Sequence, residues 1–318
     1  TTVFSGDNAF TPVISTWTAV LMVLVATGLL VVFVQDVSSS IQVGNMLSDI
    51  STDLDAAILR QRELARRACT DEPIEHDTSG WHVVNAVAAG YVQTIKFDQL
   101  IAIAQRNSCV VQLQHRPGGF VHADRPVARI SSPLPTDEEQ ALRRCIVRGT
   151  HRTMEQDLEY AIAEYVEIAL RALSPAVNDP ATAISCLDWI GDSLIALVAE
   201  PIGVAALADT SGSLRVLVPA NSFRRVIAAA FNEIRQHAVS SPAVSIRMLT
   251  TIEKVAPSVH DREALEELHS QAGAIATAAI EAAKVQRDRD DVARARLRAF
   301  AAVDAMLPTD GEPSGTAP

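Results

Sequence analysis

One long apolar segment near the start of the chain limits what this protein can be. Residues Val13 to Val34 read VISTWTAVLMVLVATGLLVVFV and contain no charged side chain. As an α-helix this segment is roughly 33 Å long, enough to cross a bilayer core of about 30 Å. It lacks the basic leader and the shorter apolar core of a secretory signal. We therefore predict a transmembrane segment within residues 1–36; the alternative is a buried core helix.

The composition agrees with one membrane-spanning helix attached to a large part outside the bilayer. The protein is 48% hydrophobic and has a mean hydropathy of +0.16, high for a soluble protein but low for one with many spans. The formal net charge is −11 and no basic stripe appears. We therefore expect the lipid bilayer as a partner and no nucleic acid.

The arginines predict which way the chain crosses. Asp7 is the only charged residue ahead of the apolar segment, and the first cations behind it are Arg60, Arg62, Arg66 and Arg67. The positive-inside rule then places the large C-terminal part in the cytoplasm, at a bacterial cytoplasmic (inner) membrane. The chain begins without Met and with a loop-like stretch, so we expect N-terminal spans to be missing.

The cysteines support a reducing compartment. They are scattered, with no Cys-x-x-Cys pair and no short disulfide framework, and we expect them to be reduced thiols. They are Cys69, Cys109, Cys145 and Cys186.

A heptad-like seam follows the apolar segment and predicts a juxtamembrane, coiled-coil-like helix over residues 37–69. Its positions are Val43, Leu47, Ile50, Leu54, Ala57, Gln61, Leu64 and Ala68. Because no proline occurs between Val13 and Ala68, one continuous helix could cover both segments. The seam packs either on another copy, which would make a homo-oligomer, or on the chain's own body.

The remaining sequence predicts a mainly α membrane protein with a β-rich insert. Residues 84–132 look like a small β-barrel or sandwich, including the stretch GYVQTIKFDQLIAIAQRN and a Pro-Gly-Gly turn. From Asp137 to residue 306 the pattern is helical and predicts an α-helical cytoplasmic domain.

One helix is expected from Thr150 to Leu173, with Leu158, Ile162 and Ala169 on its apolar face and Asp157 on its polar face. Asn178 or Asp179 caps the next helix. Further helices are expected at Ser222 to Ala238, Ala243 to Val255 and Asp261 to Met306. Residues 307–318 have the composition of a disordered tail.

Several motifs resemble a known bacterial family. The chain carries Arg152-Thr153 and Gln156-Asp157, then Ala172-Leu173-Ser174-Pro175 and Asn178-Asp179-Pro180 with Thr182-Ala183. It also carries Ser40-Ile41-Gln42, an Arg-Pro-Gly-x-Phe-Val turn at 116–121 and a Glu-Ile-Arg-Gln run at 233–236. In these the chain resembles the predicted membrane proteins of domain of unknown function 2254 (DUF2254). The resemblance implies topology, including further membrane helices ahead of Thr1, and no chemistry.

Seven polar residues of these motifs form the candidate site, a polar joint that binds an ion or ligand or is only structural. They are Arg152, Gln156, Asp157, Ser174, Asn178, Asp179 and Thr182. The second motif is a helix–turn–helix joint, and in one interpretation its Ser174, Asn178 and Asp179 only satisfy the backbone groups at two helix ends. In another, these three gather with Arg152, Gln156 and Asp157 around a small ion or ligand. A helix N-terminus there favours an anion, and the aspartates favour a cation. A role at a subunit interface is the third.

The sequence does not indicate an enzyme. It has no phosphate-binding glycine loop, no Gly-x-Ser-x-Gly elbow and no His-Glu-x-x-His, so we name no catalytic residue, no cofactor and no metal site. Two classes of function stay open. One is an oligomeric channel- or transport-like assembly gated by its cytoplasmic domain. The other is a membrane-anchored ligand-sensing or scaffold protein without transport.

Overall fold

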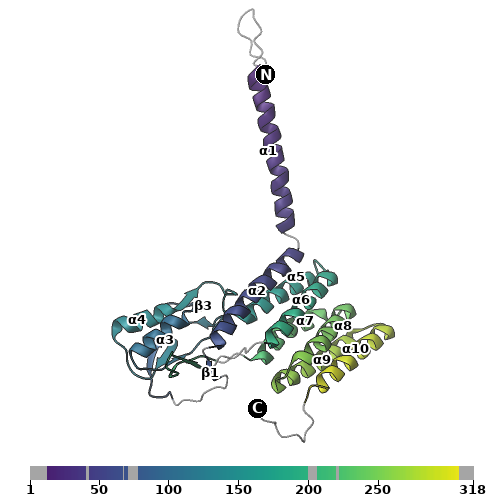
Figure 1. Ribbon diagram of the computed structural model, residues 1–318. Helices are drawn as coiled ribbons and strands as arrows, with labels where there is room; N and C mark the ends of the chain where they lie inside the picture. The colour runs from purple at the N-terminus through teal and green to yellow at the C-terminus, as the bar shows by residue number, and fades with distance from the viewer. Residues whose placement is uncertain are drawn as a thin grey trace, which may run out of the picture. The chain divides into compact units, whose positions relative to one another are not determined.

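The computed structural model describes residues 13–40, 43–66, 68–70, 78–199, 206–219 and 222–307. The chain divides into two units, Thr1–Asp49 and Ile50–Pro318. The first unit holds helix α1 (Val13–Ser40) and the beginning of α2 (Val43–Ala65) (Figure 1). The second unit holds the rest of α2 and all other elements.

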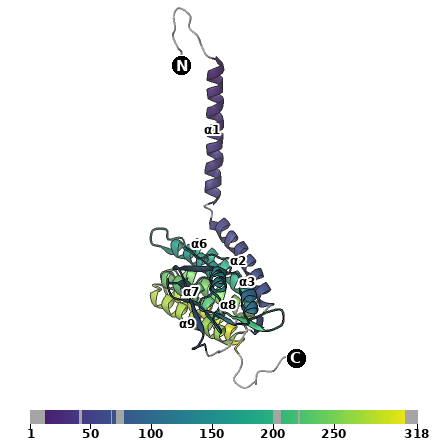
Figure 2. The same ribbon diagram turned by 90° about the vertical axis from the view of Figure 1, so that its left-hand side faces the viewer.

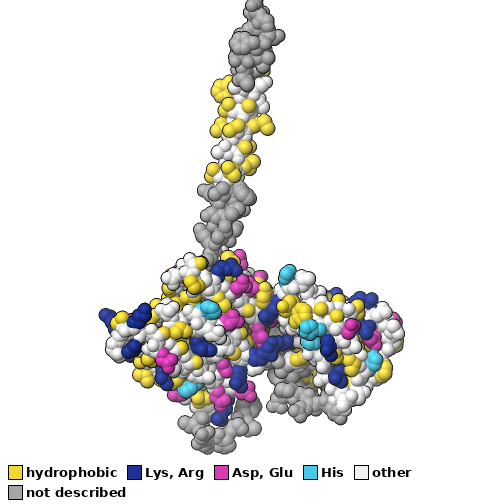
Figure 3. Space-filling view, turned by 180° about the vertical axis from the view of Figure 1, so that it is seen from behind, with side chains coloured by type: hydrophobic (Ala, Val, Ile, Leu, Met, Phe, Trp, Pro, Cys, Tyr) yellow, Lys and Arg dark blue, Asp and Glu magenta, His cyan; other side chains and the backbone are white. Residues whose placement is uncertain are grey.

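Helix α1 has the features of a membrane span. Its window Ile14–Val31 has a mean hydropathy of 2.1, and none of it is buried within the protein. Where Figure 3 describes α1, its side chains are hydrophobic or uncharged, whereas the surface of the second unit mixes charges of both signs. Helix α6 (Pro180–Val198) is a second candidate by length and composition, with a hydropathy of 1.5, but 44% of it is buried. The described chain therefore has two candidate membrane helices.

The predicted continuity of the first two helices is not tested. Helix α1 ends at Ser40 and α2 begins at Val43, and the two positions between them lie outside the described residues. The heptad-like seam gives a clearer result. Ile50, Leu54 and Ala57 are only 7%, 2% and 2% exposed within a single chain. From Ile50 onward the seam therefore packs on the chain's own body, and these positions give no support to a homo-oligomer.

Tyr165 explains how α2 is held within the second unit. Its ring is completely buried, and its hydroxyl forms hydrogen bonds with Ser51 of α2 and Ser193 of α6. Burial raises the pKa of Tyr165 to about 12. A buried phenol needs hydrogen-bond partners, so this residue ties α2 and α6 to the helix that carries it, α5 (Leu158–Leu173).

Two β-sheets form one side of the second unit. A six-stranded sheet has the order β1-β8-β9-β4-β6-β2, and a three-stranded sheet has the order β5-β3-β7. Neighbouring strands are antiparallel except β4 and β9, which are parallel. The strands are β1 (Ala68–Thr70), β2 (His82–Asn85), β3 (Gly90–Ile95), β4 (Val111–Leu113), β5 (Phe120–Val121), β6 (Pro126–Ile130), β7 (Ile146–Gly149), β8 (Ala206–Ala208) and β9 (Leu214–Leu217).

The prediction of a β-rich region is confirmed, but the predicted boundaries of that region are wrong. Part of the predicted β-stretch is helix α3 (Phe97–Arg106), because its buried residues recur at spacings of three and four. A short helix, α4 (Thr136–Cys145), begins where the sequence indicated. Strands β7, β8 and β9 then interrupt the part predicted to be helical throughout. These strands are three or four residues long, so their partners rather than their own periodicity define them.

Helices make up the other side of this unit (Figure 1; Figure 2). Besides α5 and α6 they are α7 (Phe223–Ala238), α8 (Pro242–Val255), α9 (Arg262–Ala282) and α10 (Gln286–Asp304). The apolar face predicted for α5 is confirmed, with Leu158, Ile162 and Ala169 buried. The starts of α7 and α8 are confirmed as well, and of the two caps expected for α6 the structure has Asp179.

Two helix predictions are wrong. The helix expected from Thr150 begins only at Leu158, because residues 150–157 bind the edge of β3, as described below. The long last helix is two, α9 and α10, since Ala283 ends α9 with an extended backbone (ψ 124°). Cys109, Cys145 and Cys186 are buried free thiols, as expected, and the side chain of Cys69 lies outside the described residues.

Asp209 organises the turn between β8 and β9. Its carboxylate accepts hydrogen bonds from the backbone N–H groups of Ser211 and Ser213 and from the Ser211 hydroxyl. It also pairs with Arg215 at 2.7 Å. These donors favour the ionised form and lower the pKa of Asp209 far below its usual value.

We expect Asp209 to make the protein sensitive to acid. Its lowered folded-state pKa stabilises the protein fully above the unfolded value of about 3.9, and this stabilisation is lost as the pH falls below that value. Urea unfolding at pH 6 and pH 3 should show a smaller acid-induced loss of unfolding free energy in Asp209→Asn than in the parent. Asp53→Asn, on the exposed face of α2, is the control and should behave like the parent. An equal loss in all three proteins would contradict the assignment.

Candidate functional site

Residues 150–157 form a segment of bends and a turn that binds strand β3 through its side chains. The Oε1 atom of Gln156 accepts from Ile95 N at 2.8 Å, and its Nε2 donates to Ile95 O at 3.1 Å. Thr94 donates to the Glu155 carboxylate at 2.6 Å. The Gln156 amide thus makes the two hydrogen bonds that the backbone of a neighbouring strand would make. Because the segment is held on β3 in this way, α5 begins only after it.

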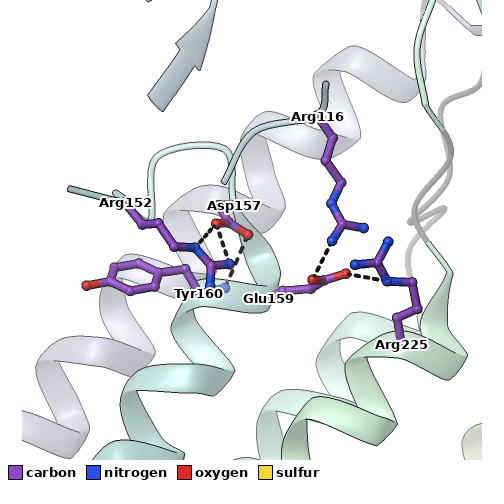
Figure 4. A network of polar contacts seen from close by, with 6 residues as sticks. All are labelled: Arg116, Arg152, Asp157, Glu159, Tyr160 and Arg225. Atoms are coloured by element: carbon purple, nitrogen blue, oxygen red, sulfur yellow. Dashed lines mark hydrogen bonds and ion pairs between the residues drawn. The ribbon is translucent and has the colours of Figure 1, made fainter. Parts of the chain in front are cut away.

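Asp157 lies at the first turn of α5 and is 5% exposed. Its Oδ2 accepts from Nε of Arg152 at 2.8 Å, and its Oδ1 caps the helix by accepting from Tyr160 N at 3.2 Å (Figure 4). Burial raises the pKa of Asp157, although the charge of Arg152 acts in the opposite direction. The sequence placed Asp157 on the polar face of its helix, and this was wrong because capping and pairing turn it inward.

A glycine from a distant turn closes over Asp157. Gly118, between β4 and β5, has a φ of +81°, and a Cβ atom built there would overlap the Asp157 carboxylate. Only glycine combines this backbone conformation with such a close approach. The Arg-Pro-Gly-Gly turn and the Arg-Thr-x-x-Gln-Asp motif, which the sequence showed separately, therefore meet here.

A second carboxylate joins three elements beside this contact. Glu159 of α5 pairs with Arg116 of the same turn at 2.9 Å and with Arg225 of α7 at 3.7 Å (Figure 4). Its Oε1 atom is buried and accepts no hydrogen bond. Burial lowers the pKa of Arg116, and the charge of Glu159 partly opposes this shift. The sheet side and the helical side of the unit are thus joined through one carboxylate.

The other predicted site residues lie at the far end of α5. The Asp179 carboxylate accepts from the N–H groups of Ala181 and Thr182 and from the Thr182 hydroxyl at 2.6 Å. These bonds lower the pKa of Asp179. Ser174 donates to Arg171 O at 2.7 Å, and Asn178 adopts a φ of +46°. Each of these groups serves the end of α5 or the start of α6, as the architectural interpretation predicted.

The structure does not bring the seven predicted residues into one site. Arg152, Gln156 and Asp157 precede α5, while Ser174, Asn178, Asp179 and Thr182 follow it. The 16 residues of α5 separate the two groups by about 24 Å along the helix axis. The expectation of a single polar joint is corrected to two separate ones. In the part of the chain that the structure describes, no three His, Cys, Asp or Glu residues lie close enough to hold a metal ion.

A cavity of about 440 Å³ adjoins the first of these groups. Its lining comes from the second half of α2, the β3–α3 junction, the Arg116–Pro117 turn, Gln156 and the end of β9. Apolar and polar side chains both contribute. The apolar lining residues are Ala57, Leu64, Ile95, Phe97, Pro117, Val218 and Pro219. A concave space of this size and mixed lining is typical of small-molecule sites.

Sequence reasoning missed the charged residues at this cavity. Arg60, Lys96 and Arg116 line it and come from three separate segments. Glu159 pairs with Arg116, and Arg225 pairs with Glu159, from two further segments. No spacing along the chain relates the five. The one available signal was the Arg-Pro-Gly-Gly turn, whose glycine with a positive φ marks a close backbone approach.

The motifs that meet at Asp157 also agree with the family comparison. The family model described as "Predicted membrane protein (DUF2254)" matches residues 1–254. The chain belongs to this family. Membership confirms the resemblance and the description as a predicted membrane protein, and it assigns no activity.

Two mycobacterial proteins are similar over nearly the whole chain. Uncharacterized protein Rv1290c of Mycobacterium tuberculosis and Uncharacterized protein Mb1321c of Mycobacterium bovis are each 26% identical over 308 residues. The matches cover 93% of this chain and 58% of each relative, so the chain spans less than two thirds of the length of these relatives. No solved structure matches the chain.

The contact between Gly118 and Asp157 can be tested with a matched glycine. We expect Gly118→Ala to lower the unfolding free energy by about 3 kcal/mol or more, because the new methyl group displaces a buried ion pair. Gly212 has the same kind of backbone, with a φ of +80°, but a Cβ there meets nothing within 4 Å. Gly212→Ala should therefore cost only about 1–2 kcal/mol of backbone strain. Equal losses in urea unfolding would show that the contact is unimportant.

Proposed function

We propose that this DUF2254 protein is a membrane-anchored ligand-binding protein, with α1 as the anchor and the second unit as the receptor for a small molecule. The cavity of about 440 Å³ lined by Gln156 and Arg116 carries the proposal. Its volume lies within the roughly 300–1,000 Å³ of known ligand pockets. Several independent segments are held together by dedicated hydrogen bonds to form its walls, which favours a binding role over a packing defect.

Helix α1 rather than α6 is the proposed span. The hydroxyls of Thr18 and Thr27 donate to the carbonyls of Ile14 and Val23 in their own helix, so these polar groups are satisfied in lipid. Helix α6 packs instead within the second unit, where the Thr251 hydroxyl of α8 reaches Leu187 O at 3.4 Å. We assign α6 to the core of that unit.

The proposed location is the bacterial cytoplasmic membrane, with the second unit in the cytoplasm. The arginines at 60, 62, 66 and 67 follow the span, and residues 1–12 ahead of it contain no cation. A cytoplasmic receptor domain agrees with the buried free thiols of Cys109, Cys145 and Cys186.

Blocking the cavity should abolish ligand binding. We expect fragments that bind the full chain in nanodiscs, detected by saturation-transfer NMR, to lose their signal in Gln61→Trp, because Gln61 lines the cavity. Leu59→Trp is the matched control on the same helix, since Leu59 is 61% exposed and lies outside the lining. If both variants bind the same fragments as the parent, the cavity is not the receptor site.

A channel- or transport-like homo-oligomer is the second candidate, favoured by the uncharged span and its threonine hydroxyls. It predicts that the full chain, reconstituted into liposomes, conducts ions or passes small solutes. Flux assays across several ions and voltages test it, with empty liposomes as the control. Absence of flux together with fragment binding would leave the anchored receptor alone.

A further inference from the structure

The cavity carries more positive than negative charge near its polar wall. Three cations line it, Arg60, Lys96 and Arg116, against the two carboxylates of Glu63 and Asp98. Glu63 is already paired with Arg66 at 2.8 Å, a residue outside the lining. Among the described residues Lys96 forms no ion pair with a carboxylate. The first turn of α3 also lines the cavity, and its N-terminal dipole adds to the positive potential.

The cavity also has an apolar wall opposite in character to its charged one. Leu64, Ile95, Phe97, Pro117 and Val218 give the cavity an apolar wall. Ile95 and Phe97 are buried, so packing against the core holds these two side chains in place. A ligand that fills the cavity therefore needs an apolar body as well as a polar group.

Arg116 is the cation best placed to change partners. It lines the cavity, and on its other side it pairs with Glu159 at 2.9 Å (Figure 4). Glu159 has a second cation, Arg225, at 3.7 Å, and its Oε1 atom has no hydrogen bond. If Arg116 turned toward a ligand, Arg225 would still compensate the charge of Glu159. A half-buried carboxylate with two arginines can release one without being left unpaired.

Building on the proposed ligand-binding function, we infer that the cavity takes a small organic carboxylate with an apolar body, and that this carboxylate competes with Glu159 for Arg116. Arginine binds carboxylates through two parallel hydrogen bonds, which favours this group over a neutral one. Because Glu159 also contacts α7 through Arg225, ligand binding would change a contact between the sheet side and the helical side.

Three probes separate the parts of this inference. Benzoate has the charge and the apolar ring, benzamide has nearly the same shape without the charge, and acetate has the charge without the ring. Equilibrium dialysis against the full chain in nanodiscs should show saturable benzoate binding. We expect benzamide and acetate each to bind at least about tenfold more weakly. Lys96→Gln should weaken benzoate binding about threefold and leave benzamide unchanged.

The competition has its own test. Glu159→Gln removes the internal rival for Arg116, so benzoate affinity should rise by about three- to tenfold. The control is Glu167→Gln on the same helix, which breaks an exposed ion pair with Arg171 and should leave affinity unchanged. If Glu159→Gln fails to fold by circular dichroism, Arg225→Gln tests the competition instead. It removes the second cation of Glu159, which should hold Arg116 more tightly and weaken benzoate binding; unchanged binding would overturn the competition.

The outcomes distinguish the two proposals. Equal, saturable binding of benzoate and benzamide would overturn the carboxylate inference and leave the ligand-binding function intact. Unchanged or weaker benzoate binding in a folded Glu159→Gln would overturn the competition. If fragments bind the parent and are lost in Gln61→Trp, but none of the three probes binds, the carboxylate inference is refuted and the ligand-binding function is not. Failure of both the probes and the fragments would refute the binding function itself.

Discussion

The buried carboxylate of Asp157 is the constraint on which the second unit depends. An ionised carboxylate removed from water costs several kcal/mol unless charge and hydrogen bonds compensate it. Arg152 supplies the charge, the first turn of α5 supplies an N–H group, and Gly118 leaves the space. Three segments must therefore meet at one point for this group to be tolerated. That requirement locates the start of α5 against the turn between β4 and β5.

The cavity follows from the same arrangement. With α5 anchored, the preceding residues lie along β3, where Gln156 binds both backbone groups of Ile95. The carbonyl of Glu155 accepts from Arg60 of α2 at 2.8 Å, so α2 is held on the other side. The walls are fixed by hydrogen bonds rather than by side chains meeting across the space. An opening between these elements can persist because none of them needs to close over it.

The candidate site was only partly predictable, and Asp157 shows why. The sequence singled out its motif but assigned it to the exposed face, since a carboxylate on a helix is usually solvated. Its burial depends on Gly118, whose turn lies about 40 residues earlier. The cap of α6 was predicted to be Asn178 or Asp179, and it is Asp179. This was possible because Asp179 and the N–H groups of Ala181 and Thr182 that it binds lie within four residues. Motifs with local partners could be interpreted, and motifs with distant partners could not.

The sequence by itself determined the elements whose cause is local. The uncharged run of α1, the apolar faces of α5 and α7 and the capping of α6 all follow from periodicity and from residues within one turn. Only the tertiary structure decided that the seam of α2 is buried in its own chain, that β7, β8 and β9 interrupt the helices, and that Arg116 stands between a cavity and Glu159. Each of these depends on pairing across dozens of residues, and such pairing leaves no periodic trace in a single sequence.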